Sequence, residues 1–86
     1  MHDTILLNKI SEAVKQVCAA NCIKKINKLA VVINHNSHVD ESNLYEHLKH
    51  TSGNLVGGWT ELKIEREDIQ DQTAILYSIQ GEKGEE

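Results

Sequence analysis

The chain has 86 residues, a length typical of one small domain, and 40% of its residues are hydrophobic, which suffices for a core. It contains neither Phe nor Pro, so the core must be built mainly from Ile, Leu, Val and Ala. The formal net charge of −4 argues against nucleic acid as a partner, and no apolar run approaches the roughly 18 residues that a membrane span needs.

The first predicted element is an amphipathic helix from Thr4 to about Ala20. Either Asp3 or Thr4 can supply the oxygen that caps its first turn. The stretch also carries Lys9 and Glu12, which argues against a signal peptide, and we therefore expect a cytoplasmic protein. Its apolar residues recur at helical spacing and predict one buried face: Leu6, Leu7, Ile10, Ala13, Val14, Val17 and Cys18.

A strand, a second helix and two further strands follow. Residues 26–34, INKLAVVIN, are apolar on both sides, which indicates a strand that is covered on at least part of both faces. Asp40 can cap the second helix, which carries Leu44 and Leu48 at i, i+4. The segments 59–67 and 73–81 alternate with period two and predict strands joined by the turn DIQDQ.

The order helix, strand, helix, strand, strand restricts the topology. A strand–helix–strand unit favours a right-handed crossover with parallel pairing, whereas two strands joined by a short turn should be antiparallel. We therefore predict an α+β fold, a three-stranded mixed sheet with two helices on one face. Residues 1–81 would form the domain, and residues 82–86 would be a disordered acidic tail.

The start of the chain, Met1-His2-Asp3, carries the clearest candidate chemistry. The α-amine of Met1 with the amide and imidazole nitrogens of His2 can form two fused chelate rings on one metal ion. Such nitrogen-rich coordination suits Ni(II) or Cu(II). Asp3 could add a further donor. On spacing alone, the same three residues also fit a polar terminus that ends in a helix cap, so both interpretations stay open.

The other four histidines form two pairs with i, i+3 spacing. His35 and His38 flank a loop, and His38 is a candidate ligand because it lies beside Asp40, which could orient a ligand as well as cap the helix. His47 and His50 lie on the second predicted helix. Because Leu44 and Leu48 define the core side of that helix, we expect both histidines to lie partly toward solvent.

Cys18 and Cys22 are four residues apart and could be a soft-metal pair, but they also fit two buried small hydrophobic residues on one helix face. The paired C-x-x-C units of a structural zinc site are absent, so we predict no structural zinc. No spacing suggests a nucleophile with a base and its orienting group, so we predict that the protein is not an enzyme.

Several features occur in a recognisable order: the start 1–3 before an amphipathic helix, Ser37 after the first strand, the pair 39–40, Leu44, and the glycine-bounded stretch 53–58. This order resembles the nickel-binding domain of the HypA family, metallochaperones that help to insert nickel into hydrogenase and, in some bacteria, urease. The resemblance covers roughly the first 67 residues and the last strand. The family begins Met-His-Glu, whereas this chain has Asp3.

The chain departs from the family most between its last two strands. The family carries a zinc domain there with two C-x-x-C pairs, but here only residues 68–72 intervene. The resemblance implies Ni(II) bound by Met1 and His2, with His38 and Asp40 approaching that site, and a GTPase or a hydrogenase large subunit as partner. The alternative is a metal-free regulatory or adaptor module with the same fold. The exposed edges of a three-stranded sheet also suggest a homodimer.

Overall fold

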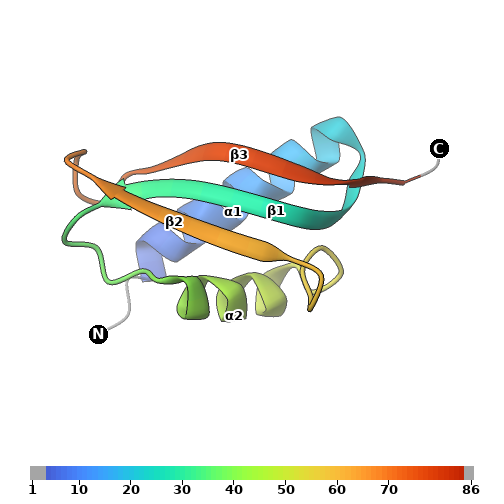
Figure 1. The fold of residues 1–86 in the computed structure, drawn as a ribbon, viewed down its shortest axis with the longest axis horizontal. Helices are drawn as coiled ribbons and strands as arrows, with labels where there is room; N and C mark the ends of the chain where they lie inside the picture. The colour runs from blue at the N-terminus through green and yellow to red at the C-terminus, as the bar shows by residue number, and fades with distance from the viewer. Residues whose placement is uncertain (1–3, 85–86) are drawn as a thin grey trace.

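The fold was obtained as a computed structural model that describes residues 4–84 (Figure 1). Within this range the chain forms two helices and three strands, which confirms the α+β class and the predicted element order. No helix in residues 4–84 combines the length and the apolar character that crossing a membrane requires. The elements are α1 (Thr4–Asn21), β1 (Ile23–Asn34), α2 (Glu41–Thr51), β2 (Glu61–Glu67) and β3 (Ala74–Lys83).

The sheet has the strand order β2-β1-β3, so β1 is the central strand. β2 runs parallel to β1, as predicted for a strand–helix–strand unit, and β3 runs antiparallel to β1. The last two strands therefore run in opposite directions, as predicted, but they are not neighbours. The turn after β2 carries the chain across to the far side of β1, which gives the most apolar strand two paired neighbours.

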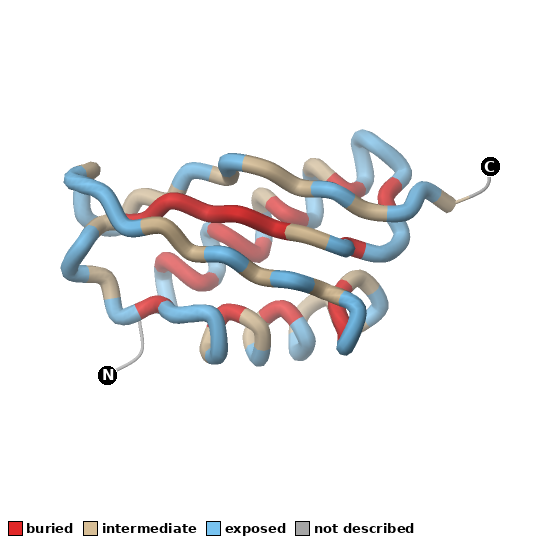
Figure 2. Tube along the Cα trace, viewed as in Figure 1, coloured by how far each residue is buried: buried red, intermediate tan, exposed pale blue. Residues whose placement is uncertain are grey.

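The hydrophobic core lies between one face of the sheet and the two helices (Figure 2). From β1 it receives Leu29, Val31 and Ile33, which are almost fully buried. On the other face of β1, Ala30 and Val32 are only 4% and 7% exposed, because strands flank them on both sides. The two helices and the segment before β2 contribute Leu6, Leu7, Ile10, Val14, Cys18, Leu44, Leu48 and Val56.

The sheet is longer at one end than the sequence pattern predicted. Cys22 adopts a left-handed backbone (φ 58°), which ends α1 and lets β1 begin at Ile23, three residues earlier than expected. This earlier start gives β3 a partner through Lys83, and the N–H of Gly84 donates to the carbonyl of Cys22 at 2.8 Å. Residues 82 and 83, which the sequence assigned to an acidic tail, thus lie in β3, and residues 85–86 lie outside the described range.

Candidate functional site

The predicted nickel ligands Met1, His2 and Asp3 lie outside the described residues. Thr4, the first residue that the structure places, begins α1. Figure 1 shows that α1 starts at the same end of the molecule as the segment that leads into α2. The backbone thus brings the start of the described chain to the end that carries His38 and Asp40, two of the residues that the sequence singled out.

Asp40 caps α2, as its position predicted. Its Oδ1 accepts a hydrogen bond from the backbone N–H of Asn43 at 2.8 Å, and its own N–H donates to Oδ1 of Asn43 at 2.9 Å. These two bonds form a capping box and fix the conformation of the entry into the helix. Asp40 remains exposed to solvent. Its carboxylate is therefore held in place by the helix end while facing water.

His38 is exposed, and its neighbours hold the backbone around it. The carbonyl of His38 accepts from Nδ2 of Asn43 at 3.0 Å. Arg66 of β2 donates to the carbonyls of Ser37 and Val39 at 2.9 and 2.5 Å, which ties the loop to the sheet. The imidazole of His38 therefore extends from a loop that is fixed on both sides of it.

The described residues do not assemble a metal centre by themselves. Within residues 4–84, no group of three or more His, Cys, Asp and Glu side chains lies close enough to hold an ion. His38 and Asp40 could take part in a metal site only together with donors from outside that range. The structure thus neither tests nor replaces the predicted site at residues 1–3.

The histidine pair on α2 lies partly toward solvent, as predicted, since His50 is exposed and His47 is partly exposed. However, Nε2 of His47 is buried and has no hydrogen-bond partner in the described structure. The helix α2 packs against α1 as well as against the sheet. Near this contact Ser11 of α1 and Thr51 of α2 lie 2.9 Å apart and share a hydrogen bond. The two imidazoles therefore do not offer a surface pair of ligands.

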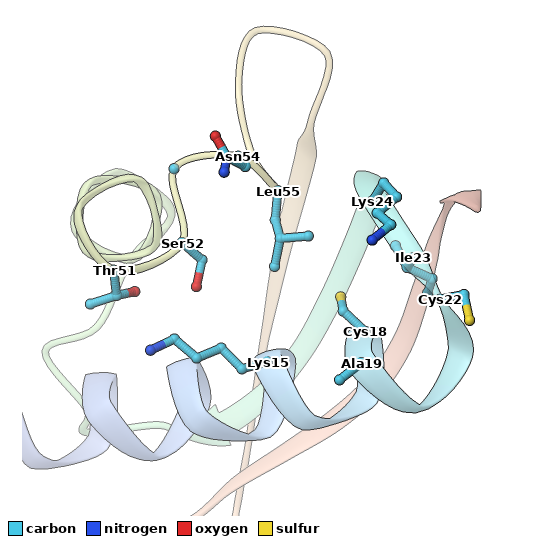
Figure 3. Close-up of a pocket in the computed structure, with 11 residues that line it drawn as sticks. Lys15, Cys18, Ala19, Cys22, Ile23, Lys24, Thr51, Ser52, Asn54 and Leu55 are labelled. Carbon is cyan, nitrogen blue, oxygen red and sulfur yellow. The ribbon is translucent and has the colours of Figure 1, made fainter. Parts of the chain in front are cut away.

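A pocket that the sequence did not predict lies at the other end of the helices (Figure 3). Its volume is about 530 Å³, and it opens between the last turns of α1, the start of β1 and the loop after α2. Lys15 and Lys24 are its charged lining residues. The hydroxyl oxygen of Ser52 is buried there without a partner. No sequence signal marks the pocket, because three segments distant in sequence create it.

The two cysteines line this pocket but do not act as a pair. Figure 3 shows the sulfur of Cys18 directed into the pocket and that of Cys22 directed away from it. The Cys18 side chain is buried, whereas that of Cys22 is exposed. Burial raises the pKa of the Cys18 thiol, so it stays protonated and weakly nucleophilic near neutral pH. The arrangement favours a core thiol and a surface thiol over a soft-metal site.

Comparisons with family models, with curated proteins and with solved structures found no match to this chain.

Proposed function

We propose that this protein binds Ni(II) as cargo near its N-terminus and delivers it to a nickel enzyme such as hydrogenase, in the manner of a HypA-like metallochaperone. The observation that carries the proposal is the placement of the start of α1 and of the His38–Asp40 segment at one end of the molecule. Residues 1–3 directly precede Thr4, and three residues span at most about 10 Å. They are thus attached at the end where the other candidate ligands lie.

The donor set fits Ni(II). The α-amine of Met1 and the amide and imidazole nitrogens of His2 supply three nitrogens, and such donors suit a tetragonal ion. Asp3 or His38 would complete the coordination, and Asp40 would orient a ligand while it caps α2. Because His38 and Asp40 are exposed, the ion would be bound at the surface. A site of this kind favours transfer over retention.

We propose that the protein acts in the cytoplasm together with partner proteins. The reducing conditions of that compartment keep cysteine side chains as thiols. The resemblance suggests a GTPase or a hydrogenase large subunit as the partner that receives or directs the metal. Catalysis by this chain and binding to nucleic acid are not part of the proposed role, and neither is structural zinc.

The decisive experiment is a nickel titration of untagged protein whose first residue is verified as Met1. We expect one Ni(II) per chain in the native protein and a loss of tight binding in His2→Ala. We also expect this loss when a single residue precedes Met1, because the extension removes the primary amine and keeps every side chain. Affinity should fall as the pH drops through about 8 to 6.5, because the nitrogens must lose protons to coordinate.

His50→Ala is the matched control, since it removes an exposed imidazole on α2. We expect it to bind nickel as the native protein does, whereas His38→Ala should weaken binding without abolishing it. If the extended protein binds with the native affinity and absorption spectrum, the N-terminal site does not exist.

The second candidate function is a metal-free adaptor module. It is favoured by the two large apolar side chains that β3 exposes, Ile75 at 48% and Tyr77 at 68%. An adaptor would show no stoichiometric nickel binding in the same titration, so that experiment separates the two functions.

A further inference from the structure

The two outer strands of the sheet differ sharply in charge. Five of the seven residues of β2 are charged, which is a common protection against edge-to-edge pairing: Glu61, Lys63, Glu65, Arg66 and Glu67. In contrast, β3 and the residue before it carry no charge from Thr73 through Gln80. Of the two strand edges that the described sheet leaves open, only that of β3 lacks this protection.

The uncharged half of β3 also exposes apolar side chains. Ile75 pairs with Val32 of β1, and nearly half of its surface remains in contact with solvent. A shift of register between Ala30 and Val31 leaves Tyr77 without a partner residue on β1. Its side chain is the most exposed of the large hydrophobic ones in the described chain. The outer N–H and C=O groups of such a strand are available to another strand.

We propose that the chain forms a two-fold symmetric dimer in which β3 pairs antiparallel with β3 of a second copy, giving one six-stranded sheet. An antiparallel pair of identical strands is self-complementary, which is what a two-fold interface requires. The proposal goes beyond nickel binding, because the β3 edge lies outside the segments that carry the candidate ligands.

The exposed side chains of β3 match those of a second copy best when the two-fold axis passes through Leu76. In that register Ile75 of one copy faces Tyr77 of the other, an aromatic and β-branched pair that stabilises sheets.

The test is sedimentation equilibrium of untagged protein from about 1 μM to 1 mM, with and without a chelator. We expect the mass to rise with concentration from the monomer value of 9.7 kDa to twice that value, in either condition. A double variant, Ile75→Lys with Tyr77→Lys, places two cations against two cations across the axis. It should remain monomeric through the concentrations at which the native protein dimerises, a loss of affinity of at least tenfold.

Two matched variants test whether dimerisation depends on the β3 edge and on the stated register. Ile75→Glu with Tyr77→Lys puts opposite charges against each other in the stated register, and we expect it to dimerise at low salt. Ile5→Lys removes an exposed side chain of α1, 64% exposed, and should dimerise as the native protein does. A thermal transition measured by circular dichroism establishes that each variant is folded.

Three outcomes would overturn the proposal. The first is a monomer mass at every concentration of the native protein. The second is a double-lysine variant that dimerises normally, which would place the interface elsewhere. The third is loss of the dimer in Ile5→Lys but not in the β3 variants. Nickel titration decides the proposed function separately, since dimerisation is expected with or without metal.

Discussion

Asp40 stabilises the start of α2 through reciprocal hydrogen bonds with Asn43, and Glu41 adds a negative charge to the first turn. The hydrogen bond from Asn43 gives one N–H group of the first turn an acceptor. The negative charges of Asp40 and Glu41 are favourable at the positive end of the helix dipole. The cap also holds the loop that contains His38, because Asn43 binds the carbonyl of that residue. The Asp40 carboxylate thus fixes the helix end, and the Asn43 side chain of the same capping box fixes the backbone beside a candidate ligand.

We expect Asp40→Ala to lower the free energy of unfolding by about 1 kcal/mol, because an N–H of the first turn loses its acceptor. Asp40→Asn keeps an oxygen acceptor and should cost only a few tenths of a kcal/mol. Urea denaturation of the native protein and both variants measures the difference. An Asn variant as unstable as the Ala variant would show that the charge, and not the hydrogen bond, stabilises the helix.

At the scale of the elements, the connection from α2 to β2 is fastened to the central strand. Thr60 donates from its hydroxyl to the carbonyl of Ile26 at 2.7 Å and accepts from the N–H of Gly57 at 3.1 Å. The N–H of Ile26 donates to the carbonyl of Leu55 at 2.8 Å. These contacts set where β2 begins and hence its parallel register with β1.

Thr60→Val keeps the shape of the side chain and removes its hydroxyl. Two backbone groups in a partly buried position then lose their partner, and we expect the free energy of unfolding to fall by about 1–3 kcal/mol. Thr60→Ser retains the hydroxyl and should lie much closer to the native protein. Thermal or urea unfolding provides the comparison, and equal stability of the Val variant and the native protein would show that these hydrogen bonds contribute nothing.

At the scale of the whole molecule, the fold depends on one apolar core that joins both helices to the sheet. Leu6, Leu29, Leu44 and Leu48 are fully buried, and they come from α1, β1 and α2. Burying a side chain of this size contributes about 1.5–3 kcal/mol. Burial of this core therefore supplies free energy for folding that does not depend on a metal ion.

We accordingly expect a cooperative thermal transition that a chelator at neutral pH leaves unchanged. The near-UV signal should persist as well, since Trp59 lies against the ammonium of Lys25, with 4.9 Å between Nζ and the ring centroid. Circular dichroism with and without EDTA makes the measurement. Loss of the transition in EDTA would mean that a structural metal holds the fold together, contrary to this prediction.

The sequence by itself determined the features that depend on near neighbours along the chain. Helical spacing predicted α1, the position of Asp40 predicted the cap of α2, and alternation predicted β2 and β3 to within a few residues. The strand–helix–strand order predicted the parallel pair. For the candidate site, the sequence identified residues 1–3, His38 and Asp40, and the structure located the last two on one fixed segment.

The tertiary structure alone decided what depends on contacts between distant segments. Only the assembled sheet places β1 between β2 and β3, because a short turn fixes the direction of the last strand but not the strand that it joins. The hydrogen bond between the hydroxyls of Ser11 and Thr51, which joins α1 to α2, connects residues 40 positions apart. The pocket at Ser52 likewise needs three separate segments, and no local pattern can encode a surface that exists only when they meet.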